Sequence, residues 1–350
     1  MQNTTVIEGE SGMFAGKDYV RLLFPAKEMP VVYNSTTGWK YEAGRDFRLS
    51  PDARVLWLTQ GSRIPHVLSA DLHPAPETCV FYPDANHNAI KGGLDGGALL
   101  FNNMSYFARQ QIEIDYFTSE YDFPALPCYP ERLLRCKQRL HDPRRECKIV
   151  CLGDSITDGY NASGRLDFPP HQPCYAELLG QRLSACCPGK VIIRNLGVNG
   201  TSSLAAVQAP ELWLPENPDL LLIAYGMNDF HRMSAGEFAD VVRRLIRLAE
   251  EANPTVECLL IASMPGNPLW ANTPPAPARD FAAALRELAA QEPATACADV
   301  HAVWQELLQR KDFYDLTGNG VNHPNDFGHR VYAETILALI MDRTQLSWMR

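Results

Sequence analysis

The chain has 350 residues, of which 46% are hydrophobic and 21% are charged, as in a soluble globular protein. This length allows one large core or two ordinary domains. The net charge of −9 argues against nucleic acid or an anionic membrane surface as a partner.

The N-terminus and the cysteines indicate the compartment. The first ten residues contain neither a basic region nor an apolar core, so we expect no signal peptide. No apolar run approaches the length of a membrane span. The 10 cysteines are scattered, and no CxxC pair has the spacing of a metal site. We therefore predict a cytoplasmic protein with reduced thiols and no bound metal.

Residues 1–125 predict a β-sandwich-like domain. Pro and Gly are frequent in this part, helical periodicity is weak, and short β-type runs alternate with turn-rich segments. The runs expected to form strands are residues 19–24, 30–33, 54–59, 79–82 and 111–116.

Residues 126–147 read as a linker, with a short amphipathic helix predicted over 131–140. Residues 148–350 then alternate apolar runs with helical stretches, which predicts βαβ units, a parallel sheet and a three-layer α/β sandwich. The apolar runs are 148–152, 191–196, 220–225, 258–263 and 296–300. The helical stretches are 173–185, 202–212, 235–252, 276–291, 303–311 and 326–341.

The first apolar run of this half, which begins at Lys148, stops at Gly153-Asp154-Ser155. A buried strand that ends at a small residue and then presents a hydroxyl is typical of the corners where α/β enzymes place their chemistry. Ser155 is therefore a candidate nucleophile, which needs a base, oxyanion donors and a supporting scaffold. Asp154 is expected to support the corner, because its side chain should point away from that of its neighbour.

Two later strand ends carry groups that suit an oxyanion. Gly200 lies after the second strand and before a helix, where free N–H groups favour a developing negative charge. Asn228 follows the third strand, and a side-chain amide is a known type of oxyanion donor. Asp229 suits the role of holding the loop around Asn228. Each of these signals alone also fits an ordinary turn.

His323 stands in a loop before the final predicted helix, from which it can reach back across the edge of the sheet. His329 falls within that helix and is expected to be structural. The other histidines lack a comparable context, so His323 is the candidate base.

Four short motifs occur in the order found in the SGNH, or GDSL-like, hydrolases. They are Gly-Asp-Ser, then Gly, then Gly-x-Asn-Asp, and finally His-Pro. The chain resembles this family over residues 148–343. The resemblance implies that Ser155 is the nucleophile and that His323 is the general base and then the general acid. It implies an oxyanion hole made by the N–H groups of Ser155 and Gly200 and by the side chain of Asn228. It also implies esterase chemistry without a metal or organic cofactor.

One position departs from the family pattern. Members usually carry Asp three residues before the catalytic His, and here that position is Gly320. Asn319 or a backbone carbonyl can orient His323 and leave a Ser–His dyad, or Asp315 can fold back to it, or Asp326 can reach it from the other side. We favour the dyad, since some carbohydrate esterases of this superfamily are similar in using a carbonyl. A neutral orienter still fixes the tautomer but stabilises imidazolium less than a carboxylate does.

The loops after the candidate nucleophile, residues 157–165 and 168–175, are polar and aromatic, and no long apolar stretch suggests a lipid lid. Tyr160 and Trp270 are candidates to stack on a sugar. The layout looks like that of carbohydrate esterases with an N-terminal jelly-roll. We therefore expect removal of acetyl groups from an acetylated oligosaccharide or another small ester, with no nucleic-acid or membrane partner and with an oligomer possible. The alternatives are a lysophospholipase or thioesterase of the same family and a non-catalytic carbohydrate-binding protein.

Overall fold

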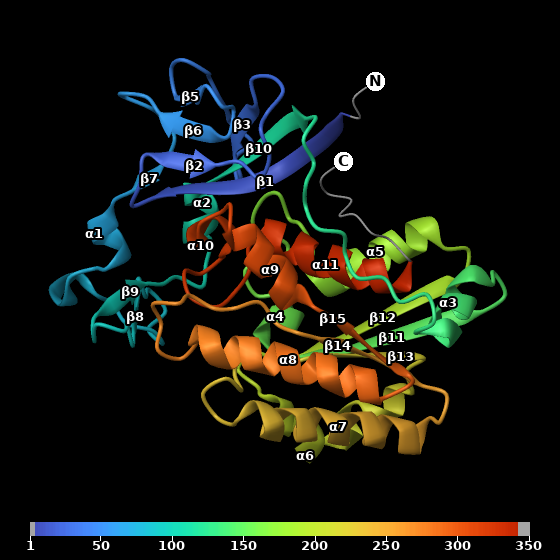
Figure 1. The fold of residues 1–350 in the computed structure, drawn as a ribbon. Coiled ribbons are helices and arrows are strands. Elements are labelled where there is room, and N and C mark those ends of the chain that lie inside the picture. Colours follow the sequence, from blue (N-terminus) through green and yellow to red (C-terminus); the bar gives the residue numbers. More distant parts are fainter. Residues whose placement is uncertain (1–3, 342–350) are drawn as a thin grey trace.

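The structure is a computed structural model that describes residues 4–341. The N-terminal strands form the upper part of the molecule in Figure 1, and a sheet between two layers of helices forms the lower part. The predicted α/β fold with a parallel sheet is therefore confirmed. Within the described residues, no helix is both long enough and apolar enough to span a bilayer.

The parallel sheet has five strands in the order β12-β11-β13-β14-β15. The central strands β13 and β14 are buried along their whole length, because helices cover both faces, and this explains their nearly unbroken apolar sequences. The strands are β11 (Glu146–Gly153), β12 (Lys190–Gly197), β13 (Leu220–Ala224), β14 (Glu257–Ile261) and β15 (Thr295–Ala298).

Two groups of helices enclose this sheet (Figure 1). One face carries α5 (Tyr175–Cys186), α9 (Val300–Leu308) and α11 (Asp326–Ile340). The other carries α6 (Ser203–Gln208), α7 (Ala235–Ala252) and α8 (Pro275–Gln291), with the 3-10 helices η2 (Pro210–Leu212) and η3 (Leu214–Glu216) after α6.

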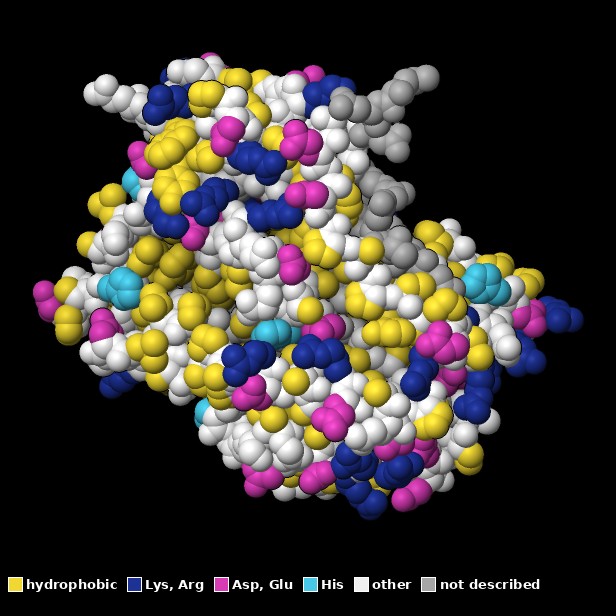
Figure 2. All heavy atoms as spheres, in the orientation of Figure 1, with side chains coloured by type: hydrophobic (Ala, Val, Ile, Leu, Met, Phe, Trp, Pro, Cys, Tyr) yellow, Lys and Arg dark blue, Asp and Glu magenta, His cyan; other side chains and the backbone are white. Residues whose placement is uncertain are grey.

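Helix α7 shows why these layers are amphipathic. It begins with a capping box, in which the Ser234 side chain accepts the N–H of Glu237 and the Glu237 side chain accepts the N–H of Ser234. Its apolar positions face α8, and its outer positions carry ion pairs such as Arg243–Asp240. Charges of both signs gather at the bottom of the molecule in Figure 2, where α7 lies in Figure 1.

The N-terminal part is rich in short strands, as predicted, and its jelly-roll likeness stays a prediction. One sheet has the order β4-β3-β10-β1-β7, a second has the order β2-β6-β5, and β8 pairs with β9. The strands are β1 (Thr5–Ala15), β2 (Tyr19–Arg21), β3 (Val31–Asn34), β4 (Lys40–Tyr41), β5 (Phe47–Leu49), β6 (Val55–Leu58), β7 (His66–Val67), β8 (Ala89–Lys91), β9 (Ala98–Leu100) and β10 (Gln111–Thr118). Short helices α1 (Ser69–Leu72), η1 (Pro76–Thr78) and α2 (Tyr106–Gln110) lie between them.

Two differences from the predicted strands stand out. The strand β1, the longest of the described strands, was not predicted, because glycines and glutamates interrupt its apolar pattern. Conversely, the run 79–82 forms no strand, and only Phe81 makes a bridge, to Ala89.

The predicted linker contains α3 (Leu134–His141), close to the helix expected over 131–140. This helix packs against the parallel sheet, since Cys136 N–H donates to the buried Glu257 carboxylate at 2.7 Å. The domain boundaries at residues 125 and 147 stay predictions.

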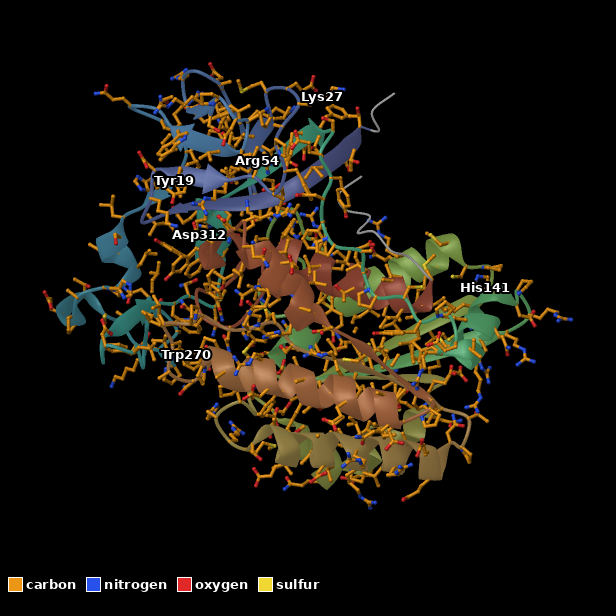
Figure 3. The ribbon with its side chains drawn as sticks, in the orientation of Figure 1. Tyr19, Lys27, Arg54, His141, Trp270 and Asp312 are labelled. Carbon is orange, nitrogen blue, oxygen red and sulfur yellow. The ribbon has the colours of Figure 1, made fainter. Side chains whose placement is uncertain are left out.

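Buried polar contacts join the N-terminal sheet to the helical layer beneath it. Lys311 Nζ donates to Glu10 at 2.8 Å, with both side chains fully buried. Near them, Asp312, labelled in Figure 3 below the N-terminal sheet, pairs with Lys17 at 2.7 Å, with both side chains partly exposed. Because a buried charge without a partner is costly, the Lys311–Glu10 pair favours a single arrangement of the two parts.

Candidate active site

Ser155 lies where β11 ends, as the first residue of the short helix α4 (Ser155–Asp158). Asp154 caps this helix by accepting the N–H of Ile156 at 2.9 Å. Gly153 is required before it, because a Cβ there would collide with the side chain of Thr157 and the carbonyl of Ala224.

His323 lies in the loop between α10 (Phe313–Leu316) and α11. Its Nε2 is 2.8 Å from Oγ of Ser155. Ser155 is 3% exposed and His323 is 5% exposed, so water competes little for this hydrogen bond. The two residues that the motif order singled out thus meet in space with the geometry of a nucleophile and its base.

The partner of the second imidazole nitrogen is a residue that the sequence reasoning missed. Nδ1 of His323 lies 2.7 Å from Oδ1 of Asn161. Asn161 belongs to the loop that follows α4 and adopts a left-handed conformation with φ 65°, which asparagine tolerates better than most residues. A side-chain amide, and not a carboxylate, therefore orients the imidazole.

The orientation of the Asn161 amide follows from its other neighbours. Its Nδ2 donates to the carbonyl of Gly318 at 3.0 Å and to the carbonyl of Asn103 at 3.3 Å. Carbonyl oxygens only accept, so the amide oxygen must face His323. Nδ1 of His323 then carries the hydrogen, and Nε2 is left to accept the proton of Ser155.

The three orienters weighed from the sequence bond elsewhere. Oδ1 of Asn319 accepts the backbone N–H of His323 at 3.1 Å, so this residue holds the loop and not the ring. Asp315 accepts the N–H of Met13 at 2.7 Å and caps α10. Asp326 accepts the N–H of Ser163 at 2.8 Å. The expectation that Asn319 or Asp315 orients the imidazole is therefore replaced by Asn161.

Asp229 joins the two loops expected to form the oxyanion hole. Its carboxylate accepts from the N–H and hydroxyl of Ser203 and from the N–H of Gly226. Asn228 Nδ2 donates to the carbonyl of Thr201 at 2.9 Å, which ties it to the loop that contains Gly200. Gly200 is exposed with φ 77°, a conformation that suits glycine.

Burial controls the protonation of the site. It lowers the pKa of His323 to about 3, and the nearby His329 adds to this effect. Burial also raises the pKa of Asp154 to about 7, with a smaller contribution from Asp229. His323 is consequently a neutral base at ordinary pH, without a carboxylate to stabilise its charged form.

The two aromatic residues proposed for sugar stacking have different surroundings. The ring of Tyr160 lies 5.7 Å from the imidazole of His323, so Tyr160 borders the site. Trp270, labelled at the left of Figure 3, donates its Nε1 hydrogen to the carbonyl of Lys91 at 3.0 Å and packs against the β8–β9 hairpin. Among residues 4–341, no group of three or more His, Cys, Asp or Glu side chains is arranged to hold a metal ion.

Comparison with known proteins gives a family match. The model of the GDSL-like lipase/acylhydrolase family matches residues 151–331, just over half of the chain. This range begins in β11 and ends within α11, so it contains both Ser155 and His323. A search of the curated proteins found no match.

Several solved structures are similar to the chain. Axe2, an acetylxylan esterase from Geobacillus stearothermophilus, is 20% identical with a TM-score of 0.47, over 61% of this chain and 99% of Axe2. A member of the lipolytic protein G-D-S-L family from Veillonella parvula is 20% identical with a TM-score of 0.45, over 56% of this chain and 98% of its own. LAE5, an α/β hydrolase from the metagenome of Lake Arreo, Spain, is 22% identical with a TM-score of 0.46, over 56% of this chain and 95% of LAE5. Likeness at this level carries no conclusion about substrate.

Proposed function

The chain belongs to the GDSL-like lipase/acylhydrolase family and is a carboxylic ester hydrolase, and we propose that it removes small acyl groups from carbohydrate through a covalent acyl-enzyme. The observation that carries the mechanism is the buried contact of 2.8 Å between Ser155 Oγ and His323 Nε2. A serine hydroxyl is a weak nucleophile without such a base.

In the first half of the reaction, Ser155 attacks the ester carbonyl while Nε2 of His323 takes its proton. The carbonyl oxygen becomes an oxyanion, which the N–H groups of Ser155 and Gly200 and the side chain of Asn228 stabilise. One such donor contributes about 10²–10³ in kcat. The intermediate then collapses, the alcohol leaves with the proton from His323, and the acyl group stays on Ser155.

In the second half, water enters where the alcohol left. His323 takes a proton from that water, the hydroxide attacks the acyl carbon, and the returning proton restores the Ser155 hydroxyl as the acid leaves. Asn161 keeps the hydrogen on Nδ1 throughout, because its oxygen lies 2.7 Å away. A neutral amide stabilises the imidazolium less than a carboxylate does, so the barrier is higher than in a carboxylate triad.

A carbohydrate substrate is supported by a groove of about 790 Å³ between the N-terminal sheet and the loop that follows α4. Trp39, 58% exposed, and Phe168 both line this groove. The guanidinium of Arg63 lies 5.8 Å from the centroid of the Trp39 ring. An exposed aromatic face with polar neighbours suits the apolar face of a sugar ring.

One observation favours the alternative of a lysophospholipase or thioesterase. A mostly apolar hollow of about 470 Å³ lies beside β12 and is lined by Leu196, Val198 and Leu212 among others. Thr201 also lines it, and its carbonyl is the acceptor of the Asn228 amide. An acyl chain longer than acetyl would find apolar contacts there.

Three measurements test these proposals. A fluorophosphonate should label the wild type and fail to label Ser155→Ala. Labelling of both would show that another residue is the nucleophile, and labelling of neither would leave a non-catalytic binder. An acetate-release screen over acetylated xylo-, manno- and pectic oligosaccharides should find a substrate. Faster hydrolysis of p-nitrophenyl octanoate than of the acetate, reversed by Leu212→Gln, would instead establish the alternative.

A further inference from the structure

A segment that precedes the parallel sheet in the chain, residues 84–103, reaches the candidate site. His87 in this segment is 6% exposed, and its ring stacks on Phe101 with ring centroids 5.2 Å apart. Farther along, the N–H of Asn102 donates to the carbonyl of Asn319 at 3.2 Å. The segment therefore lies directly against the loop that carries the candidate base.

The hydrogen bonds that begin at Ser155 and pass through the candidate base to Asn161 continue into this segment. Nδ2 of Asn161 donates to the carbonyl of Asn103 at 3.3 Å. The N–H of Asn103 donates to Nε2 of His87 at 3.1 Å. Nδ1 of His87 lies 2.6 Å from the carbonyl of Asp84. An unbroken chain of five hydrogen bonds thus runs from the serine hydroxyl to a backbone carbonyl of the N-terminal part.

Every bond in this chain runs in the same direction. The carbonyl of Asp84 only accepts, so Nδ1 of His87 carries its hydrogen and Nε2 is the acceptor for Asn103. The carbonyl of Asn103 also only accepts, so Asn161 turns its NH₂ group toward it and its oxygen toward His323. Successive hydrogen bonds that share an imidazole or an amide group strengthen one another by about 10–30% per bond, and here His323, Asn161 and His87 provide such groups, whereas Asn103 only joins the two stretches through its backbone.

The alternative orientation of the Asn161 amide would disable the site. If the amide rotated by half a turn, its NH₂ group would face Nδ1 of His323, and the hydrogen of the imidazole would move to Nε2. That nitrogen would no longer accept the proton of Ser155. Two carbonyls oppose the rotation. That of Gly318 belongs to the same loop as His323, whereas that of Asn103 belongs to the N-terminal part and does not depend on this loop for its place in the chain.

We propose that His87 and Asn103 are positioning residues of the active site, which hold the Asn161 amide and thereby the productive tautomer of His323. The N-terminal part then completes the catalytic apparatus. This inference rests on the proposed function, because it takes His323 as the base. The side chain of Asn103 adds to the effect, since its Oδ1 accepts from Asn319, which in turn holds the backbone of His323.

The test compares three variants in the full chain. His87→Phe keeps the stacked ring but removes both hydrogen bonds of the imidazole, and His87→Gln restores an acceptor for the N–H of Asn103. Asn88→Ala is the matched control, because Asn88 is exposed and also makes two hydrogen bonds within the N-terminal part, to Val80 and Thr78. For p-nitrophenyl acetate, kcat should fall about fivefold to tenfold in His87→Phe at unchanged KM, the size of one lost hydrogen bond. His87→Gln should stay within about twofold of the wild type and Asn88→Ala should be unchanged.

A second readout separates positioning from general destabilisation. The ¹⁵N resonances of imidazole distinguish a protonated ring nitrogen from a bare one. In the wild type, both His87 and His323 should be Nδ1–H tautomers, and in His87→Phe the His323 signal should shift toward a mixture.

Three results would overturn the proposal: an Nε2–H tautomer at either histidine of the wild type, an unchanged kcat in a folded His87→Phe, or an equal loss in Asn88→Ala. If His87→Phe does not fold, the wild-type spectra alone decide. If the wild type hydrolyses no ester, the proposed function fails, while the tautomers still test the chain of hydrogen bonds.

Discussion

The substitution Asn161→Asp tests the central feature of the site, a base oriented by a neutral amide. In the wild type, burial lowers the pKa of His323 to about 3, and the nearest side-chain oxygen, 2.7 Å away, carries no charge. A carboxylate at this position would place a full negative charge against Nδ1. The charged form of the imidazole would then be stabilised, and the pKa of His323 would rise.

An opposite charge at this distance raises a pKa by about 1–3 units. The pH below which kcat/KM falls should therefore move from about 3 in the wild type to about 4–6 in the variant. At about 1.36 kcal/mol per unit, this is about 1.4–4 kcal/mol of stabilisation of the imidazolium. The pH limit moves upward because the base acts only when neutral, so a higher pKa of His323 removes activity at acid pH.

The same substitution weakens the fold. Aspartate cannot donate, so the carbonyls of Gly318 and Asn103 lose their partner at distances of 3.0 and 3.3 Å. Each unsatisfied buried group costs about 1–3 kcal/mol. The variant should therefore unfold at a lower temperature than the wild type, even though its base is better stabilised.

The assay is kcat/KM for p-nitrophenyl acetate from acid to neutral pH, with samples made alkaline before absorbance is read. Asn161→Ala is the control, since it removes the orienter without adding a charge. In that variant the fall at acid pH should not move upward, and kcat should drop by about 10²-fold or more at all pH values. A wild-type profile that already falls near the usual histidine pKa of about 6.5, or an Asn161→Asp profile that matches the wild type, would refute the reasoning.

Three further predictions concern stability. In the folded wild type, Asp154 has a pKa of about 7 and keeps its proton, whereas in the unfolded chain this carboxyl has already released it. The free energy of unfolding of the wild type should therefore fall as pH rises from about 4 to 7, and it should fall less in Asp154→Asn. Gly320→Ala should cost about 1–3 kcal/mol, since φ is 90° there and a Cβ would lie 2.5 Å from the Leu100 carbonyl. Asp315→Ala should lower the melting temperature, because the buried N–H of Met13 loses its acceptor, while most of kcat remains.

Denaturant titrations at several pH values, thermal melts and steady-state kinetics check these expectations. A parallel loss of stability with pH in Asp154→Asn and the wild type would show that the carboxyl is not protonated in the fold. A melting temperature unchanged in Gly320→Ala would contradict the close approach of the Leu100 carbonyl to this position. A loss of kcat in Asp315→Ala as large as that in His323→Ala would show that the Asp315 carboxylate takes part in catalysis.

Much of the fold was predictable because the parallel sheet is buried on both faces. Its strands are therefore continuous apolar runs, and its helices repeat with a clear amphipathic period, as in α7, which begins and ends where the sequence predicts. The strand β1 was not predictable in this way. Its Glu10 is buried because Lys311, Tyr116 and the N–H of Leu23 all donate to its carboxylate, and a local pattern carries no information about a partner 301 residues away.

The sequence by itself determined which residues form the chemical pair. Ser155 and His323 follow motifs at the ends of elements, and the common direction of parallel strands brings such ends to one edge of the sheet. The tertiary structure decided what orients the base. The contact between Asn161 and His323 depends on a left-handed turn after α4 and on carbonyls from Gly318 and Asn103, which no spacing encodes. A hydrogen bond requires its atoms within about 3 Å, and only packing places segments from both parts of the molecule that closely together.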